Sequence, residues 1–258
     1  MRSLRKNTPA VTASAYEGPA IVIEHLHKEF NGHVILKDFN LTVNRNENVV
    51  ILGKSGAGKS VLIKCIIGLL KPDGGIIKVY GDNVVGLRHQ ELDRVRTKIG
   101  FLFQGNAIYD SMTIRENLEF PLRRHWFNLS QQEVNDMVMD ALEHVGLAHT
   151  VDMMPAELSG GMQKRVALAR TMILKPEIIL YDEPTTGLDP VTARDIDNLI
   201  VSLHHKFNTA AIIISHDMNC VRNTADRVVL LLEGEVYAEG SFEQLEQSAD
   251  ENIKQFFE

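Results

Sequence analysis

The sequence predicts an α/β protein whose buried, largely parallel sheet is interrupted by a helical insert. Apolar runs of strand length recur along the chain and alternate with helical patterns. From about residue 105 to residue 175 the pattern changes and contains helical stretches. A chain of 258 residues with 44% hydrophobic content is long enough for one sizeable core with such an insert. The strand-length runs occupy residues 20–23, 49–52, 178–181, 211–214 and 228–232.

Local patterns predict the elements around this sheet. Residues 21–43 are rich in strand patterns, and Asn31-Gly32 predicts a turn between two apolar runs. Inside the insert, residues 130–145 predict an amphipathic helix that begins with a serine suited to cap it. Residues 159–174 predict another helix before the chain returns to the core.

Charge and hydropathy exclude several classes of protein. Lys and Arg total 27 against 34 for Asp and Glu, so the net charge of −7 disfavours nucleic acid as a partner. No stretch approaches the roughly 18 consecutive apolar residues that a membrane span needs. Residues 1–19 carry three basic residues but no apolar signal core, so we expect a flexible tail and a cytoplasmic protein.

The domain organisation follows from these patterns. We expect one main domain over residues 20–240, with the insert at about 105–175, and a helical C-terminal tail over 241–258. The two cysteines, Cys65 and Cys220, have no CxxC partner and lie among apolar residues. They are expected to be buried structural thiols.

A phosphate-binding loop is predicted at residues 53–60, GKSGAGKS, between the run at 49–52 and a helix expected over 59–70. Glycines let successive N–H groups turn toward phosphates, and the helix N-terminus adds partial positive charge. Lys59 should reach the β- and γ-phosphates and Ser60 should bind Mg²⁺. A chance glycine turn is the alternative, which the strand, the spacing and the Lys-Ser pair disfavour. The residues expected to contact nucleotide are Gly53, Lys54, Ser55, Gly56, Ala57, Gly58, Lys59, Ser60 and Val61.

Two carboxylates, Asp182 and Glu183, end the run at 178–181, at the edge where parallel sheets bind ligands. Alone, such a pair often caps the next helix. Beside a phosphate-binding loop it indicates a hydrolytic site. We expect Asp182 to hold Mg²⁺ through water and Glu183 to polarise the attacking water.

A second glycine-rich segment, Ser159-Gly160-Gly161, precedes a helical run and could also bind an anion. One chain does not readily need two such segments for one triphosphate, unless the second serves a nucleotide held by another copy. The sequence therefore predicts a head-to-tail dimer. In isolation, a helix cap would be the simpler interpretation of this segment.

The order of these segments resembles the nucleotide-binding domain of ABC transporters. The series continues with Gln104 before the glycine-rich segment, then Gly187-Leu188-Asp189 and His216, and the resemblance covers about residues 21–240. It implies a P-loop NTPase (RecA-like) core with an antiparallel β subdomain and an inserted α-helical subdomain. It also implies hydrolysis of ATP with Mg²⁺.

The resemblance gives roles to residues that would not be assigned a function if each were considered alone. Gln104 matches a loop that senses Mg²⁺ and the γ-phosphate, and His216 matches a switch that contacts the γ-phosphate; alone they would be a surface amide and a strand-end histidine. Phe30 stands where the family places an aromatic that stacks on adenine, although a core or hairpin aromatic is the alternative. Asp189 matches a residue that links the two dimer sites, although Pro190 could make it a plain N-cap.

One departure from the family pattern concerns the signature segment, which usually reads LSGGQ. Here Met162 takes the fifth position and Gln163 is displaced by one. A thioether cannot make the polar contact expected of the glutamine. We therefore expect weaker contacts to the partner's nucleotide, with Ser159, Gly160 and Gly161 still able to bind it.

Within the family, three softer signals resemble the ATPase subunit of Mla/Mce-type phospholipid transport systems. They are FQGNAIYDSMT at 103–113, MPAELSGGM at 154–162 and the aromatic tail IKQFF at 253–257. The resemblance implies a second copy of the chain, a membrane permease, an MCE-domain lipid-binding protein and a small regulatory subunit as partners. It places the subunit at the cytoplasmic face of the inner membrane, in phospholipid transport that maintains outer-membrane lipid asymmetry.

Coupling to the permease is expected at residues 105–113 and 118–122, with Ile108, Tyr109 and Met112 as anchors. The alternative is that these residues pack the insert's own core. A soluble non-transport ABC ATPase, of the Fe–S assembly or cell-division type, would share every ATPase motif and is the alternative function. A DNA-repair ATPase would need a long coiled coil or a basic DNA-binding face, and neither appears in the sequence. A P-loop GTPase would need an NKxD motif, which is also absent from the sequence.

Overall fold

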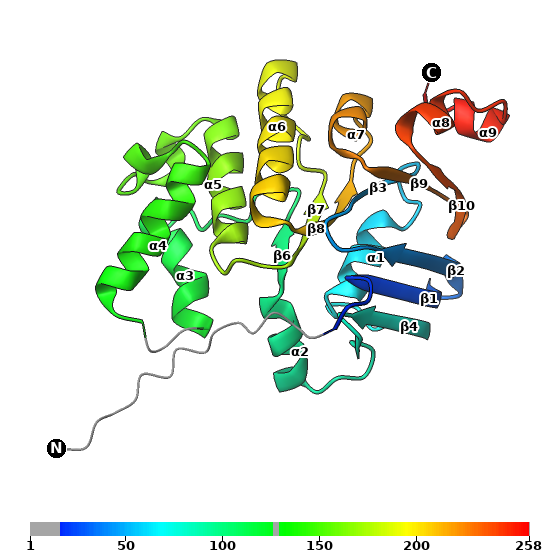
Figure 1. Ribbon diagram of the computed structural model, residues 1–258, viewed down its shortest axis with the longest axis horizontal. Helices are drawn as coiled ribbons and strands as arrows, with labels where there is room; N and C mark the ends of the chain where they lie inside the picture. Colours follow the sequence, from blue (N-terminus) through cyan, green and yellow to red (C-terminus); the bar gives the residue numbers. More distant parts are fainter. Residues whose placement is uncertain (1–15, 126–128, 258) are drawn as a thin grey trace.

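The structure is a computed structural model that describes residues 16–125 and 129–257 (Figure 1). Most of the expected N-terminal tail, residues 1–15, therefore lies outside the described residues. Four strands form an antiparallel sheet: β1 (Ile21–Phe30), β2 (His33–Val43), β4 (Gly74–Val79) and β5 (Asp82–Asn83). Six form a second sheet: β3 (Asn48–Leu52), β6 (Ile99–Leu102), β7 (Ile178–Asp182), β8 (Ala210–Ile214), β9 (Arg227–Leu232) and β10 (Glu235–Gly240).

The helices cover the second sheet and build the insert. They are α1 (Lys59–Ile66), α2 (His89–Thr97), α3 (Ile114–His125), α4 (Gln131–His144), α5 (Gly160–Met172), α6 (Pro190–Phe207), α7 (Met218–Thr224), α8 (Phe242–Glu246) and α9 (Glu251–Lys254). Two 3₁₀ turns lie at Ala148–Thr150 and Pro155–Glu157.

The second sheet has the order β10-β9-β3-β8-β7-β6, with β10 antiparallel at one edge and the other pairings parallel. The first sheet has the order β2-β1-β4-β5 and is antiparallel. Every residue of β3, β7 and β8 is buried, which explains why these strands read as continuous apolar runs. The predicted α/β class, with an antiparallel subdomain and a helical insert, is confirmed.

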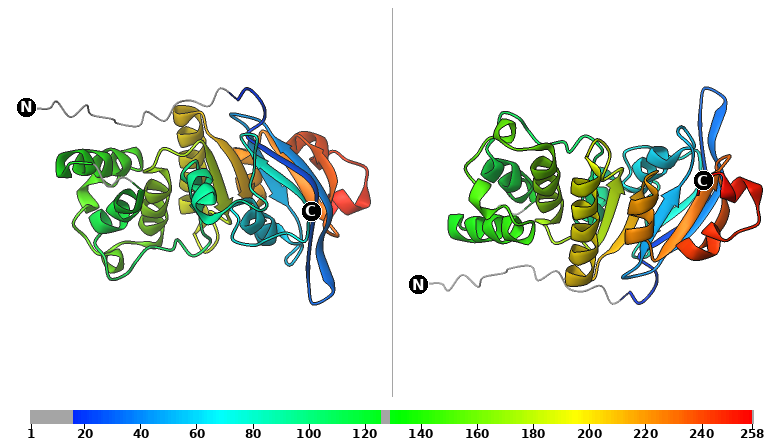
Figure 2. Two further views of the ribbon diagram at one scale, coloured as in Figure 1. Left: turned by 90° about the horizontal axis from the view of Figure 1, so that it is seen from below. Right: turned by 90° about the horizontal axis from the view of Figure 1, so that it is seen from above.

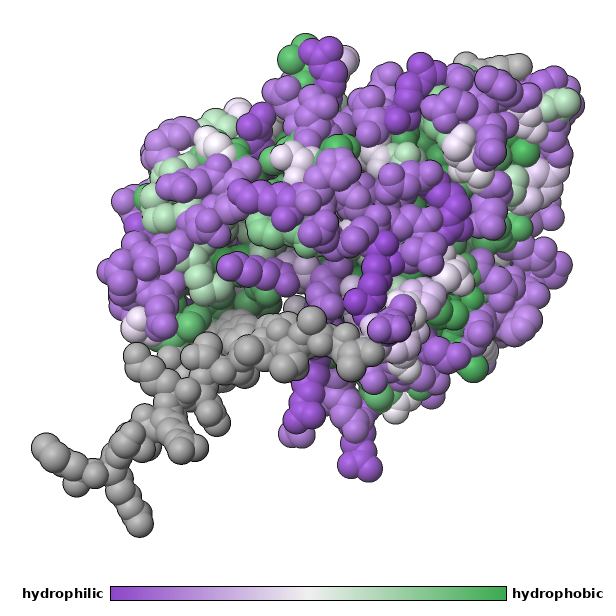
Figure 3. All heavy atoms as spheres, viewed as in Figure 1, coloured by the Kyte–Doolittle hydropathy of each residue, from purple (hydrophilic) through white to green (hydrophobic). Residues whose placement is uncertain are grey.

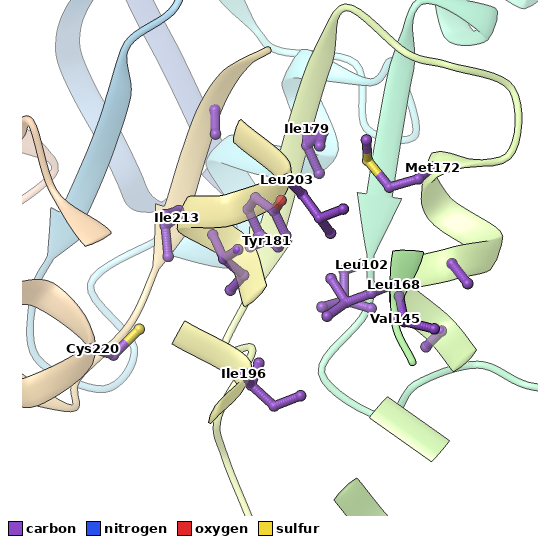
Figure 4. Packing of buried hydrophobic residues seen from close by; sticks show 14 of the residues in the cluster. Leu102, Val145, Leu168, Met172, Ile179, Tyr181, Ile196, Leu203, Ile213 and Cys220 are labelled. Carbon is purple, nitrogen blue, oxygen red and sulfur yellow. The ribbon is translucent and has the colours of Figure 1, made fainter. Parts of the chain in front are cut away.

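Side chains of the parallel strands point alternately into two hydrophobic clusters, one on each face of the sheet. Ile179 and Tyr181 belong to the cluster that includes the insert helices, whereas Ile178 and Leu180 belong to the cluster under the antiparallel sheet. Tyr181 is 1% exposed and lies among side chains from several elements, including Leu102 and Leu203 (Figure 4). The site at the end of β7 therefore rests on a rigid support.

The hairpin between β1 and β2 confirms the predicted turn. Asn31 and Gly32 both have left-handed backbone, with φ of 50° and 80°, which is the conformation that a two-residue hairpin requires. The expected first strand at 20–23 was too short, because β1 continues to Phe30. Register shifts beyond Ile23 and polar residues on the outer side interrupt the apolar run there.

The helix after the phosphate-binding loop was also predicted incorrectly at its end. It was expected to reach residue 70, but α1 ends at Ile66. Gly68 has a left-handed φ of 66°, and the N–H groups of Leu69 and Leu70 both donate to the carbonyl of Lys64. This glycine turn ends the helix although the apolar pattern continues.

Helices α3, α4 and α5 stand at one end of the molecule and the antiparallel sheet at the other (Figures 1 and 2). The predicted helices at 130–145 and 159–174 correspond to α4 and α5, and Ser130 and Ser159 cap them by accepting hydrogen bonds from main-chain N–H groups. Leu118 and Leu122 of α3 are 0% and 1% exposed. The expectation that they face a partner is wrong, because both pack the insert's own core.

The cysteines, the surface and the lengths of the helices can be compared with what the composition predicts. Cys65 and Cys220 are buried, as predicted. The face shown in Figure 3 is mostly hydrophilic, with apolar side chains scattered among polar ones. No helix in the described part of the chain is both long enough and apolar enough to cross a membrane.

Candidate functional site

The phosphate-binding loop joins the buried strand β3 to α1 at the carboxyl edge of the sheet. Gly58 has φ of 101° and packs so closely that a Cβ there would lie 2.8 Å from Cγ2 of Ile35. Nζ of Lys59 donates to the carbonyls of Gly53 at 2.6 Å and Lys54 at 3.1 Å. Burial lowers the pKa of Lys59, although Glu183 and Asp182 oppose this effect. The loop thus holds an ammonium group at the start of a helix, where phosphates bind.

Ser60 and Asp182 lie together as predicted for a magnesium site. The hydroxyl of Ser60 donates to Oδ1 of Asp182 at 3.2 Å. Burial raises the pKa of Asp182, and the charge of Glu183 adds to the effect, so a cation beside this carboxylate would be stabilising. Among the described residues no cluster of three or more His, Cys, Asp or Glu could hold a metal. The donor set fits Mg²⁺ bound by one hydroxyl, one carboxylate, water and substrate phosphates.

Glu183 and His216 form a pair at the ends of neighbouring strands. Nδ1 of His216 lies 2.7 Å from Oε2 of Glu183, and Thr186 donates to the same oxygen at 3.2 Å. The Glu183 side chain is 13% exposed and that of His216 is 68% exposed. Glu183 has a left-handed φ of 53°, which is unusual for a residue with a Cβ. Its N–H group donates to the carbonyl of Ile214 at 2.9 Å, which fixes this backbone position.

These groups open into one cleft of ≈ 520 Å³, within the range of small-molecule sites. Phe30 lies at the β1–β2 hairpin, is 42% exposed and lines the cleft, so it is no core aromatic, and its stacking on adenine stays a prediction. The predicted residues that line the cleft are Phe30, Gly53, Ser55, Gly56, Gly58, Lys59, Ser60, Val61, Gln104, Glu183 and His216.

Two predicted nucleotide-binding residues have other side-chain contacts. Nζ of Lys54 donates to Oε1 of Gln255 at 3.3 Å, which brings the C-terminal tail beside the loop. The methyl group of Ala57 packs against the cluster under the antiparallel sheet. Neither residue lines the cleft, and the N–H group of Ala57 donates to the carbonyl of Lys54 at 3.1 Å, so their contact with nucleotide stays a prediction.

The signature segment lies outside this cleft. Ser159 caps α5 by accepting a hydrogen bond from the N–H group of Met162 at 3.3 Å, and Gly160 has open space around it. Met162 is half-buried and packs against the insert, whereas Nε2 of Gln163 donates to the carbonyl of Pro155 at 3.0 Å. The displaced glutamine therefore points into its own loop and does not replace the glutamine of the usual signature.

Asp189 occupies the N-cap of α6, as the alternative interpretation predicted. Its Oδ1 accepts from the N–H groups of Val191 and Thr192, each at 3.1 Å. The hydroxyl and N–H group of Thr192 lower the pKa of Asp189. The link across a dimer stays a prediction.

Sequence reasoning missed the buried polar residues of the insert, of which Lys164 and Asn117 contact the segment that follows β6. Lys164 on α5 donates to the main-chain oxygen of Gln104 at 3.1 Å. Asn117 on α3 is 0% exposed and exchanges hydrogen bonds with both the N–H and the carbonyl of Tyr109, at 2.8 and 3.0 Å. A lysine on the same helical face as Leu168 was the signal that could have indicated Lys164.

Comparison with known proteins shows the family to which the chain belongs. The family model described as ABC transporter matches residues 36–186, and the chain belongs to the ABC transporter family. In architecture it resembles the dimeric post-hydrolysis ATP-binding cassette MJ0796 with ADP and Pi (TM-score 0.78, 32% identity, 86% of this chain and 98% of that one). It also resembles cbiO1 of Clostridium perfringens (TM-score 0.82, 29% identity, 89% and 91%).

Curated relatives carry several transport names. The chain is 39% identical over 236 residues to the intermembrane phospholipid transport ATP-binding protein MlaF of Haemophilus influenzae, covering 92% of this chain and 89% of the relative. It is 38% identical over 239 residues to the probable ribonucleotide transport ATP-binding protein mkl of Mycobacterium leprae, covering 93% and 69%. It is 34% identical over 251 residues to the methionine import protein MetN of Campylobacter jejuni, covering 92% and 75%. The chain is an ATP-binding subunit of an ABC transporter and hydrolyses ATP.

Proposed function

We propose that this ATPase works as a head-to-tail homodimer that drives a membrane permease and moves phospholipid, so that outer-membrane lipid asymmetry is maintained. Its place would be the cytoplasmic face of the inner membrane. Within residues 20–240 the ATPase domain would bind nucleotide, and residues 241–258 would form an appended tail. An MCE-domain lipid-binding protein and a small regulatory subunit would complete the system.

The observation that carries the dimer is the separation of the two glycine-rich segments. Lys59, Glu183 and Phe30 share one cleft, whereas Gly160 is exposed on the insert and does not line it. A second copy turned head to tail would place its Ser159-Gly160-Gly161 segment over this cleft. The similar cassette MJ0796 is dimeric, which supports a dimer of this chain.

The chemistry follows from the groups in the cleft. The N–H groups of the loop and the Lys59 ammonium would bind the phosphates, and the Phe30 ring would stack on adenine. Glu183, fixed by its backbone and by His216, would orient the attacking water. Ser60, Asp182 and Gln104 would hold Mg²⁺, which when bound neutralises charge on the phosphates. His216 would contact the γ-phosphate from its exposed side.

The exposed face for a permease lies on the insert. Tyr109 and Phe120 are 42% and 39% exposed, and their rings lie 5.0 Å apart. The guanidinium of Arg170 lies 5.6 Å from the Tyr109 ring. This aromatic patch, defined by Tyr109 and Phe120, would receive a cytoplasmic helix of the permease. Ile108 and Met112 are half-buried beside it.

Phospholipid as the cargo is supported by the MlaF relatives and by the resemblance of the signature segment. The decisive experiment is to purify the tagged protein from its native membranes, identify co-purifying membrane proteins and reconstitute the complex in proteoliposomes. We expect a permease and ATP-dependent transfer of a fluorescent phospholipid. Purification without any membrane partner would instead support a non-transport ATPase, and transfer of methionine or a nucleotide would support another cargo.

A further inference from the structure

A buried cation connects the signature helix to the Gln104 loop. Lys164 lies on α5 and is 2% exposed. Its ammonium donates to the main-chain oxygen of Gln104 at 3.1 Å. Burial lowers the pKa of Lys164, and no carboxylate in the described part of the chain offsets the effect. A charge buried in this way is costly, so the hydrogen bond to Gln104 is its main compensation.

The two ends of this contact belong to different nucleotide sites. Gln104 lines the cleft that contains Lys59 and Glu183 of the same subunit. Ser159 caps the same helix that carries Lys164, little more than one helical turn away. In the proposed dimer the Ser159 segment faces the partner's nucleotide. Lys164 thus joins, inside one subunit, a residue of its own site to a segment that completes the other site.

The connection from Gln104 is firmer toward α5 than toward the loop that follows. Thr171 of α5 also packs closely on β6, since a Cβ added at Gly100 would lie 2.8 Å from its Cγ2, while its hydroxyl donates to the carbonyl of Ala167 in its own helix at 2.8 Å. Beyond Gln104, Asn106 and Ala107 both have left-handed backbone, with φ of 60° and 54°. Oδ1 of Asn106 is buried with no hydrogen-bond partner in the described structure. Strained backbone of this kind is typical of segments that change conformation, so a displacement of Gln104 can be taken up in this loop while the hydrogen bond to Lys164 is kept.

We propose that Lys164 is a positioning residue that transmits nucleotide binding at Gln104 to the Ser159-Gly160-Gly161 segment of the same subunit, and through it to the partner's ATP site. A displacement of Gln104 toward bound nucleotide moves its carbonyl oxygen, and the ammonium carries the start of α5 with it. The last step rests on the proposed head-to-tail dimer. The step from Gln104 through Lys164 to the Ser159 segment takes place within one subunit. It does not depend on the dimer, the permease or the lipid.

The methyl group of Met162 offers a reporter inside the signature segment. We would record methyl spectra of the full chain with ¹³C-labelled methionine, under dilute conditions where sedimentation shows a monomer, and assign the signal with Met162→Leu. Addition of Mg²⁺ and a non-hydrolysable ATP analogue should shift the Met162 signal of the unsubstituted protein. Lys164→Leu should lose this shift while its Kd for the analogue stays within about twofold. Lys164→Arg, which keeps a donor, should restore it.

Arg165→Leu is the matched control. Arg165 is the next residue of α5 and its Nη1 also donates to a main-chain carbonyl, that of Val145 at 3.4 Å, but it does not contact Gln104. Its variant should keep the Met162 shift. In ATPase assays on the dimer, Lys164→Leu should lower kcat about tenfold with KM within about twofold, because binding is retained and the partner's site is misaligned.

Two results would overturn the inference: a Met162 shift that persists in Lys164→Leu, or no shift in the unsubstituted monomer when the analogue is bound. If Lys164→Leu does not fold, Lys164→Gln, whose amide is too short to span the same distance, gives the same test. Failure to find a permease or lipid transfer would leave the monomer result unchanged. The inference and the proposed function can therefore fail separately.

Discussion

Nδ1 of His216 and Oε2 of Glu183 lie 2.7 Å apart, at the ends of the adjacent strands β8 and β7. The strained backbone of Glu183 and this contact both orient one carboxylate toward the cleft. A group fixed in this way can position a water molecule without further rearrangement.

Replacing Glu183 by glutamine should therefore stop hydrolysis without preventing ATP binding. The amide keeps the shape and the hydrogen bonds but removes the charge that orients water. We expect the variant to accumulate as an ATP-bound dimer, visible in sedimentation. Glu177→Gln, at the opposite end of β7, is the control. Turnover of Glu183→Gln within about threefold of wild type, or about 0.7 kcal/mol of barrier, would contradict the assigned role.

Lys59 and Ser159 should show separable defects. Lys59→Ala removes charge-assisted hydrogen bonds worth about 1.5–3 kcal/mol, so ATP binding should weaken at least about tenfold in a titration. Ser159→Arg should bind ATP as a monomer but fail to form the ATP-dependent dimer. Ser130→Arg removes an equivalent cap on α4 and should still dimerise. Normal dimerisation of Ser159→Arg would exclude the trans signature.

A charge on the aromatic patch should uncouple transport from hydrolysis. Tyr109→Glu places a carboxylate where we expect a permease helix, and should abolish lipid transfer while the isolated subunit keeps its ATPase activity. Tyr237→Glu on β10 is the matched control, since the two tyrosines are 42% and 41% exposed. Equal transfer rates for the two variants, or cysteine crosslinks to the permease from other faces only, would rule out this placement.

Asp182→Asn should stabilise the nucleotide-free protein at neutral pH. Burial raises the pKa of Asp182 and Glu183 adds to the effect, outweighing the hydrogen bond from Ser60 and the charges of Lys64 and Lys59. The folded state therefore favours the protonated acid, and this advantage is lost as pH rises through the folded pKa. The Tm of the variant should exceed that of wild type at pH 7.5, and the difference should shrink below about pH 4, the usual aspartate range.

When Mg²⁺ and ATP are added, the Tm of wild type should exceed that of Asp182→Asn, because only wild type would gain the full stabilisation by the ligand. A variant less stable than wild type at pH 7.5 without ligand would show that Asp182 has a structural partner beyond Ser60.

Both cysteines should be unreactive in the folded protein. Burial raises the pKa of Cys65 to about 11 and also raises that of Cys220, so neither forms a thiolate at pH 8. A thiol reagent at pH 8 should label no cysteine in native protein and both after denaturation. Rapid labelling of folded protein would mean that one of these positions opens locally.

The nucleotide motifs could be predicted from sequence because each is a local feature. Gly58, Lys59 and Ser60 act through spacing along a few residues, and Asp182 directly follows a buried strand. The parallel strands were equally clear, since burial on both faces requires continuous apolar runs.

Other features depend on contacts that no local pattern contains. The bond between Lys164 and Gln104 joins residues 60 positions apart. The end of α1 depends on the left-handed backbone of Gly68, and the burial of Leu118 depends on how α3 packs on its neighbours. The resemblance assigned Phe30 to the adenine, but its exposure in the cleft at the end of β1 became visible only in the structure.

The order of strands around β3 also bears on how the protein is made. β3, which carries the phosphate-binding loop, pairs with β8 and β9, whose partners include Ile212 and Leu230. The ribosome synthesises the chain from its N-terminus at about 5–20 residues per second, so β3 emerges well before its partner strands β8 and β9. Its four apolar residues, Val49 to Leu52, stay unpaired during that interval. Chaperone occupancy on nascent chains should therefore begin soon after residue 52 emerges and end only once residue 232 has left the exit tunnel.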